Sequence, residues 1–234
     1  MEKSTNIIEN ESIANIYKLT SIDVCEAMKT RLEGLTAAEV EEKHRQYGMN
    51  VITEKKGTPI LLVFLSNFIS LMAILLWVGG AIAIVADMPQ LGIAIWLVNV
   101  INGVFSFWQE FRAGKATEAL KRMLPSYVRV SREGQEKQIL AEDLVPGDIV
   151  LLQEGDKISA DARLLDSSDL QADQSTLTGE SNPVRKTHDP VLRDNLSRAE
   201  IPNLIFAGTS IASGTAKAVV IATGMDTEFG KIAH

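Results

Sequence analysis

Two long apolar runs dominate the middle of the chain, Pro59–Ala86 with 28 residues and Met88–Gln109 with 22, and Asp87 is the only charge between their ends. A helix rises about 1.5 Å per residue and a bilayer core is about 30 Å thick, so either run is long enough to span a membrane. The pattern predicts two antiparallel transmembrane helices, at about 59–86 and 89–108, joined by a short turn at Asp87. The alternative, a pair of core helices in a soluble protein, is disfavoured by the length of the charge-free runs.

Basic residues flank the predicted hairpin. Lys55 and Lys56 precede the first run, while Arg112 and Lys115 follow the second. Because cytoplasmic flanks are enriched in Lys and Arg, we expect both flanks in the cytoplasm and Asp87 outside. The interpretation is a multi-pass integral membrane protein, in the plasma membrane, whose N-terminus and C-terminal domain are cytoplasmic.

The hairpin also contains polar and aromatic residues that suggest specific roles. Tryptophans in such segments are candidates for the membrane interface. Amides at membrane depth either line an ion path or form hydrogen bonds between helices, and the second role is favoured. The tryptophans are Trp77, Trp96 and Trp108, and the amides are Asn67, Asn99 and Asn102.

The polar segment 1–58 shows two helix starts. Thr20 and Thr36 are each followed three residues later by an acid, Asp23 and Glu39, which is the pattern of a capping box. We expect helices of about ten residues after each threonine, the second ending near Gly48. The segment is therefore predicted to be a small helical unit preceding the membrane.

Beyond the hairpin the pattern changes twice. Residues 109–124 continue as a helical stalk that Pro125 ends. Residues 125–234 then alternate short strands with Gly-rich turns, which favours a β-sandwich or barrel-like domain able to fold alone. The expected strands are Tyr127–Ser131, Gln138–Leu140, Asp148–Leu152, Ala162–Leu165, Leu204–Ala207 and Ala216–Thr223.

Composition excludes several function classes. The net charge of −7 disfavours a nucleic-acid partner, because phosphate contacts require a basic face. The single cysteine, Cys25, excludes an intrachain disulfide and is expected to be a small buried side chain. No His/Cys cluster has metal-ligand spacing, so the sequence identifies no metal site.

One loop carries candidate chemistry. In the stretch 173–184, Gly179 permits a tight turn, and Glu180 stands between the hydroxyls of Thr178 and Ser181. A carboxylate presented in this way is able to orient a water molecule and accept its proton. Taken by itself, Thr-Gly-Glu-Ser is more typical of an ordinary surface turn.

The wider context resembles the P-type cation-transporting ATPases over about residues 14–234, most closely the calcium-pump-like branch. The matching stretches include the Thr-Gly-Glu-Ser loop, the turn Pro146-Gly147-Asp148, Asp161, the pair Gly208-Thr209 and the segment Thr223–Ile232. Ser159 stands where the family usually has Pro, which changes one turn and no chemistry.

The resemblance implies a fold and a mechanism. The C-terminal domain would be the actuator domain, a distorted jelly roll, of an ATP-driven cation translocase. Glu180 would position the water that hydrolyses an aspartyl phosphate on another domain, with Thr178, Gly179 and Ser181 fitting the loop to the phosphate. The complete pump would use ATP and Mg²⁺. Its partners would be the remaining pump domains and membrane helices, the lipid bilayer and the transported cation.

The sequence lacks other parts of such a pump. No Asp lies in Asp-Lys-Thr-Gly-Thr, the family's phosphorylation motif, and the stretch Gly224–Lys231 does not have the spacing of a P-loop. We therefore expect this chain alone to be inactive. A membrane-anchored regulatory or binding module without catalysis is the alternative. Ca²⁺ is the first expectation for the cation, and Na⁺ and H⁺ remain open; a heavy metal is disfavoured because no Cys-x-x-Cys segment precedes the hairpin.

Overall fold

The computed structural model describes residues 15–52, 59–122, 126–193 and 196–233. Contacts divide the chain into two compact units, one within residues 1–54 and 125–234 and the other within residues 55–124. The basic residues Lys55 and Lys56 and the helix-ending Pro125 lie outside the described residues. Predictions that depend on their conformation therefore stay predictions.

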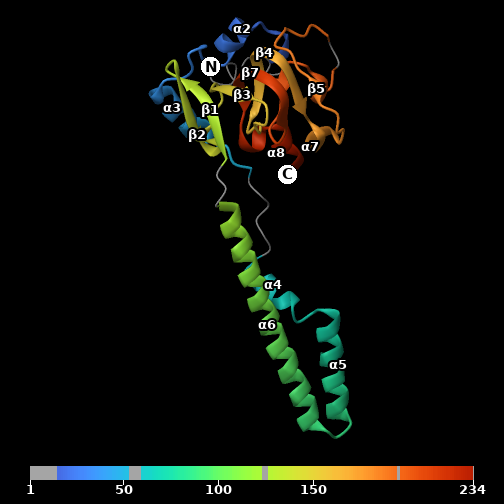
Figure 1. Ribbon diagram of the computed structural model, residues 1–234. Coiled ribbons are helices and arrows are strands. Elements are labelled where there is room, and N and C mark those ends of the chain that lie inside the picture. Colours follow the sequence, from blue (N-terminus) through green and yellow to red (C-terminus); the bar gives the residue numbers. More distant parts are fainter. Residues whose placement is uncertain (1–14, 53–58, 123–125, 194–195, 234) are drawn as a thin grey trace, which may run out of the picture. The chain divides into compact units, whose positions relative to one another are not determined.

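The second unit is helical (Figure 1). Its helices are α4 (Ile60–Ser66), α5 (Leu71–Val85) and α6 (Pro89–Arg122). Within α6, residues Pro89–Lys115 are long and apolar enough to cross a membrane. The predicted continuous helix over 59–86 is wrong, because α4 and α5 meet at an angle of 56° and would span only as one broken segment.

The break between α4 and α5 has a local cause in two polar side chains. Asn67 Nδ2 donates to Val63 O at 2.9 Å, and Ser70 Oγ caps α5 by accepting from Ala73 N at 3.3 Å. Such side-chain bonds give the backbone an alternative to helix continuation.

Polar groups also join the helices of this unit. Asn99 Nδ2, on α6, donates to Ala73 O of α5 at 3.2 Å, so the predicted helix-to-helix role of this amide is confirmed. Trp96 Nε1 donates across the same pair to Trp77 O at 3.1 Å. A Cβ added to Gly80 would lie 2.3 Å from the Trp96 indole nitrogen, so the close approach of α5 and α6 requires glycine there.

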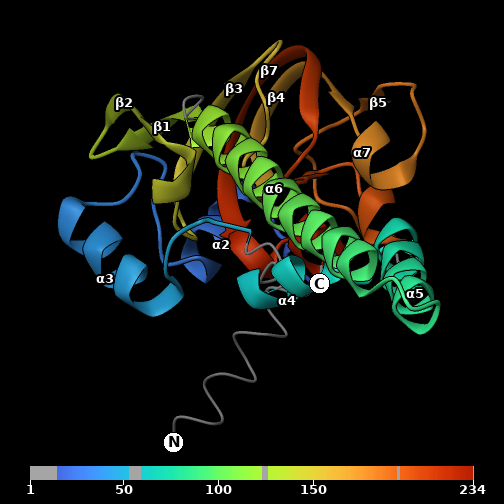
Figure 2. The ribbon, with the colours of Figure 1, turned by 90° about the horizontal axis from the view of Figure 1, so that it is seen from below.

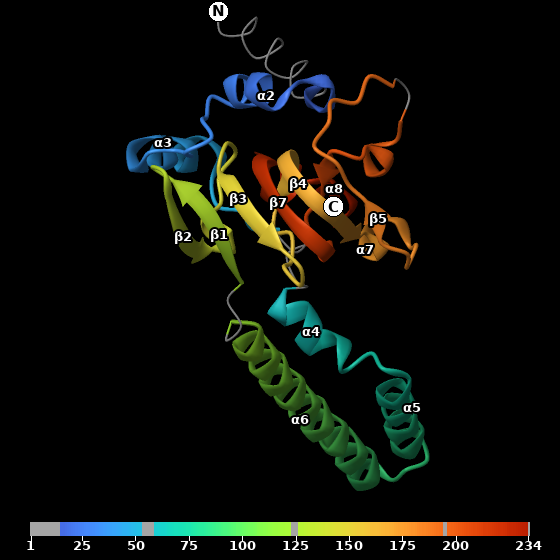
Figure 3. The ribbon, with the colours of Figure 1, turned by 45° about the horizontal axis from the view of Figure 1, so that its top comes forward.

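The first unit contains one seven-stranded antiparallel sheet, ordered β2-β1-β3-β7-β4-β5, with β6 also paired to β4 (Figure 3). The strands are β1 (Tyr127–Arg132), β2 (Gln135–Leu140), β3 (Ile149–Gln153), β4 (Asp161–Asp173), β5 (Val184–Arg185), β6 (Leu204–Ile205) and β7 (Ser210–Ala222). The short helices that follow the strands of this unit are α7 (Ser175–Thr178) and α8 (Glu228–Ala233). Its 3-10 turns are η1 (Ile16–Lys18), η2 (Ala141–Asp143), η3 (Arg198–Glu200) and η4 (Gly224–Asp226).

The two central strands are longer than the sequence pattern predicted. β4 and β7 each have 13 residues, whereas the predicted strands were Ala162–Leu165 and Ala216–Thr223. Register shifts interrupt their pairing, including one between Leu164 and Asp166, and the stretch 166–169 is polar. Bulges break the two-residue period by which strands are recognised, so the polar half of β4 gave no strand signal.

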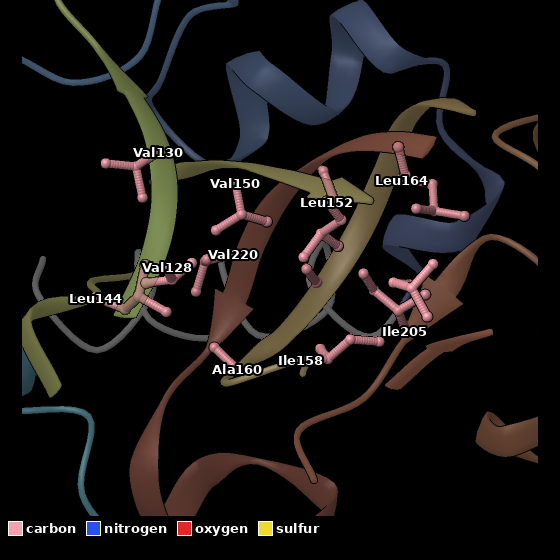
Figure 4. Close-up of a cluster of buried hydrophobic side chains, with 14 of the residues drawn as sticks. Val128, Val130, Leu144, Val150, Leu152, Ile158, Ala160, Leu164, Ile205 and Val220 are labelled. Atoms are coloured by element: carbon pink, nitrogen blue, oxygen red, sulfur yellow. The ribbon is translucent and has the colours of Figure 1, made fainter. Parts of the chain in front are cut away.

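Both faces of the sheet are buried. One face encloses a cluster that includes Val150, Leu164 and Val220 (Figure 4). Alternate residues of the same strands, including Leu165 and Val219, belong to a second cluster on the other face. Because successive side chains in a strand point to opposite faces, each central strand contributes to both clusters.

The N-terminal segment closes the second cluster. Its helices are α2 (Ser21–Ala27) and α3 (Ala37–Tyr47). The predicted caps are confirmed: Thr20 accepts from Asp23 N, Thr36 and Glu39 form a full capping box, and Gly48 follows α3 with a positive φ of 76°.

Contacts with the sheet make this segment part of the domain. Ile16, Val24 and Cys25 are buried against the sheet, which confirms the expected burial of the cysteine. Arg163 of β4, fully buried, donates from Nη2 to Leu19 O at 2.8 Å. These contacts argue against the expectation that the β-domain folds without residues 1–58, which stays a prediction to be tested.

Candidate functional site

The candidate loop leaves the sheet at the end of β4 and returns at the start of β5. The two strands pair through Ala172 with Val184 and Gln171 with Arg185, so both ends of the loop are fixed in one ladder. The one-turn helix α7 lies beside β5, at the opposite end of the sheet from β2 (Figures 2 and 3). The Thr-Gly-Glu-Ser sequence begins at Thr178, the last residue of this helix.

Two residues start α7. Asp173 Oδ1 accepts from Ser175 N at 2.9 Å, and this hydrogen bond lowers the pKa of the Asp173 carboxyl. Gln174 O accepts from the backbone N–H groups of Leu177 and Thr178, both at 2.9 Å. The first loop residues are therefore ordered by local hydrogen bonds.

Gly179 ends α7 in the left-handed conformation, with φ at 78°. This is the expected turn, because only glycine adopts that conformation without a steric cost. The Thr178 hydroxyl donates to Gln174 O at 3.1 Å and accepts from Glu180 N at 3.3 Å. Thr178 and Gly179 together set the direction in which the chain presents Glu180.

Glu180 and Ser181 are both exposed at the tip. The Glu180 carboxylate has no hydrogen bond or ion pair to the part of the chain that the structure describes. A carboxylate with free acceptor oxygens and no cationic partner is able to orient a water molecule and take its proton.

A second contact holds the flank of the loop. Thr176 Oγ1 donates to Gly208 O at 2.8 Å. Gly208 has a φ of +81°, and a Cβ there would lie 3.0 Å from the Phe229 ring, so the predicted glycine is required by its backbone and its surroundings. Thr209 is buried and donates to Phe206 O at 2.7 Å. Thr176, Gly208, Thr209 and Phe229 line a cavity of about 510 Å³ beside α7.

Asp161 holds two neighbouring backbone segments of the same region. It is 2% exposed and accepts from Ala207 N at 2.9 Å and from Glu228 N at 2.8 Å. Burial raises the pKa of Asp161, and the two backbone hydrogen bonds oppose that rise. The residue joins β4 to the 206–208 turn and to the start of α8, which supports a structural role.

The Pro146-Gly147-Asp148 turn is not part of the loop's surroundings. Asp148, fully buried, binds Arg132 through two hydrogen bonds of 2.8 and 2.7 Å. Gly147 O accepts from Thr30 Oγ1 at 2.7 Å. The buried turn thus anchors the N-terminal segment on the sheet.

No pattern in the sequence marked Lys186, the residue that follows β5. It is 2% exposed, and its Nζ donates to Ile201 O at 3.2 Å. When the Gln174 amide is oriented with its oxygen toward Lys186, Gln174 Oε1 accepts from Lys186 Nζ at 3.0 Å, and Gln174 Nε2 donates to Ala199 O at 3.2 Å. Burial lowers the pKa of Lys186 to about 8.

Asn50 is a second residue whose side chain joins distant parts of the chain. Its Nδ2 donates to Ala141 O at 2.9 Å and to Ser159 O at 2.8 Å, while its Oδ1 accepts from Gly224 N at 2.7 Å. One amide therefore joins the end of the N-terminal segment to three parts of the domain. Ser159, the departure from the family pattern, takes part through its backbone only.

The stretch Gly224–Lys231 does not form a phosphate-binding turn. The Gly224 amide, which a phosphate-binding turn would direct at its ligand, donates to Asn50 instead. Lys231 pairs with Glu228 at 2.8 Å. Among residues that the structure describes, no three His, Cys, Asp or Glu side chains gather in a way that could hold a metal ion.

Comparison with known families identifies the class of protein. The family described as P-type ATPase actuator domain matches residues 122–234, and the family described as cation transporter/ATPase, N-terminus, matches residues 16–83. The chain therefore carries the N-terminal and actuator domains of the P-type cation ATPases.

Three relatives illustrate the range of this class. A calcium-transporting ATPase of Bacillus subtilis is 36% identical over 93% of this chain and 24% of its own length. The P-type sodium-transporting ATPase4 of Plasmodium falciparum is 37% identical over 97% of the chain and 17% of its length. The sodium/potassium-transporting ATPase subunit alpha of Drosophila melanogaster is 34% identical over 97% and 23%. The chain thus spans about a quarter or less of the length of these curated relatives.

Proposed function

We propose that this chain is the actuator part of an ATP-driven cation pump, in which Glu180 positions the water that hydrolyses an aspartyl phosphate. The observation that carries this proposal is the exposed Glu180 carboxylate, unpartnered among the described residues, on a loop whose two ends are fixed in the sheet. A base held in this way accelerates hydrolysis by aligning the nucleophile as well as by accepting its proton.

The other components of the reaction belong to the rest of the pump. The phosphorylated aspartate, ATP and Mg²⁺ are supplied by other domains, and rotation of the actuator domain moves the membrane helices that open and close the ion path. The hairpin crosses the membrane with both flanks in the cytoplasm. The names of the relatives support Ca²⁺ and Na⁺ as candidate cations.

The test is a chimera in which this chain replaces the matching region of the Bacillus subtilis calcium-transporting ATPase. Phosphoenzyme is formed with labelled ATP and its decay is followed after a chase. Glu180→Gln keeps the size of the side chain and removes the base, so phosphoenzyme should form normally and decay about 10²-fold more slowly. Thr178→Ala should have a smaller effect, because it removes a supporting hydroxyl and leaves the base.

The matched control is Glu154→Gln, which changes an exposed carboxylate in a different turn and should leave the decay rate unchanged. Unchanged decay in Glu180→Gln would show that the loop has no hydrolytic role. The chain would then be a non-catalytic docking or regulatory module.

A further inference from the structure

Lys186 is an unusual residue for its position. It is buried in the first unit, and the residues that the structure describes offer its ammonium group no salt bridge. The group instead lies 5.7 Å from the centre of the Phe206 ring and donates to two neutral oxygens. Removing a cation from water without a carboxylate partner is costly, and an apolar side chain of similar size would avoid that cost. The cation is therefore not explained by packing alone.

The position of Lys186 relative to the loop suggests what the amine does. Gln174 is the first residue after β4, and Lys186 is the first after β5. The Lys186 backbone N–H donates to Leu170 O of β4 at 2.9 Å, and its side chain reaches Gln174 Oε1 at 3.0 Å. The side-chain bond thus closes the base of the loop, inside the domain.

Gln174 connects this base to the tip. Its side chain is held by Lys186 and Ala199, while its backbone oxygen accepts from Leu177 N, Thr178 N and the Thr178 hydroxyl. Thr178 in turn bonds the Glu180 backbone. A charged donor forms a stronger hydrogen bond than a neutral one, so the ammonium group fixes Gln174 more firmly than a hydroxyl or amide would.

We propose that Lys186 is a positioning residue that closes the base of the Glu180 loop by holding Gln174, a role that rests on the proposed function of Glu180. It does not touch the reacting atoms. It acts through Gln174 and α7, and it keeps the loop in one conformation while the tip remains exposed.

The test uses the whole 234-residue chain in detergent. Lys186→Met keeps a long side chain and removes the donor. Amide hydrogen exchange of Leu177, Thr178 and Gly179 should become about tenfold faster, which corresponds to loss of one hydrogen bond to a charged group. Exchange in the centre of β7 should not change. Lys137→Met, which removes an exposed lysine on β2 at the far end of the sheet, is the matched control and should change neither region.

A second variant guards against loss of the fold. Gln174→Met removes the acceptor and leaves Lys186 in place, and it should speed exchange in α7 to a similar extent. The double variant should add little to either single change, because the two residues act through one bond. Unchanged exchange in α7 in both single variants, or strictly additive effects, would overturn the proposal.

The chimera separates this proposal from the function of the loop. Lys186→Met should slow phosphoenzyme decay by about tenfold without affecting its formation, since a less ordered loop presents Glu180 correctly less often. If Glu180→Gln slows decay and Lys186→Met does not, the positioning role is wrong and the proposed function stands. If Lys186→Met speeds amide exchange in α7 but Glu180→Gln leaves phosphoenzyme decay unchanged, the proposed function is wrong. The hydrogen-bonded connection from Lys186 through Gln174 to α7 would still stand.

Discussion

Removal of the N-terminal segment is expected to unfold the β-domain. Four large apolar side chains of that segment are almost fully buried: Ile16, Val24, Met28 and Leu35 are each at most 6% exposed. At about 2 kcal/mol for each buried side chain, they contribute about 8 kcal/mol. Without the segment, Arg163 also loses the backbone acceptors of Ile16 and Leu19, which adds about 2 kcal/mol or more for unsatisfied buried donors. The sum is similar to the whole stability of an ordinary domain, about 5–15 kcal/mol.

The assay compares two soluble chains that both lack the membrane hairpin. One is residues 125–234 alone, and the other joins residues 1–54 to 125–234 through a short Gly/Ser linker. A short linker is sufficient, because Ile52 and Ser126 line the same cavity. Urea unfolding is followed by far-ultraviolet circular dichroism, since all three tryptophans lie in the removed hairpin.

The joined chain should unfold in one cooperative transition, and the shorter chain should show no folded baseline at any urea concentration. The reasoning is refuted if residues 125–234 alone unfold cooperatively at the same urea midpoint as the joined chain. If residues 125–234 alone unfold cooperatively at a lower urea midpoint than the joined chain, the sheet covers the face left by the N-terminal segment in some other way.

Three further predictions concern topology, backbone strain and a buried charge. A cysteine in place of Asp87 should react with an impermeant reagent from outside, and one in place of Lys137 should react only after permeabilisation; the opposite labelling would exclude the proposed orientation. In the joined chain, Gly34→Ala should lower the free energy of unfolding by about 3 kcal/mol or more, because φ is +88° and the new Cβ would lie 1.8 Å from a backbone oxygen of β1. The control Gly134→Ala, where φ is +72° and the Cβ would meet open space, should lower it by only about 1 kcal/mol. Burial lowers the pKa of Lys186 from 10.5 to about 8, so as the pH rises the native state loses this proton before the unfolded state does. The free energy of unfolding, measured relative to Lys186→Met, should therefore rise by about 3 kcal/mol between pH 8 and 10.5. A difference that stays constant over this range would contradict the burial of a charged amine.

Local features of the fold were predictable where a few neighbouring residues determine them. The capping box of Thr36 and Glu39 and the turn at Gly179 each depend on hydrogen bonds or dihedral angles within four residues. The exposure of Glu180 was also predictable from its neighbours in the sequence, because polar residues on both sides of a glycine turn stay at the surface.

Features that depend on distant contacts were not predictable. The length of β4 is set by its pairing with β7 through several bulges, which the spacing of apolar residues does not reveal. Lysine is exposed in most proteins, and nothing next to Lys186 in the sequence marks it as buried, because its acceptors come from Gln174 and Ile201. The break between α4 and α5 depends on Asn67 and Ser70, and the apolar run around them concealed its effect.

The exposed tip and the buried base of the loop meet two opposed requirements of the proposed function. Glu180 has to approach a phosphate on a different domain, so it cannot be held by partners on its own domain's surface. A free loop, however, would lose conformational entropy on each approach and would present the carboxylate in many orientations. Ordering the loop from its base resolves the conflict, because Lys186 and Gln174 restrict the backbone from inside the domain while the Glu180 oxygens stay available to water. On this argument, the cost of burying the Lys186 ammonium group is offset in catalysis, where a preordered loop aligns the attacking water.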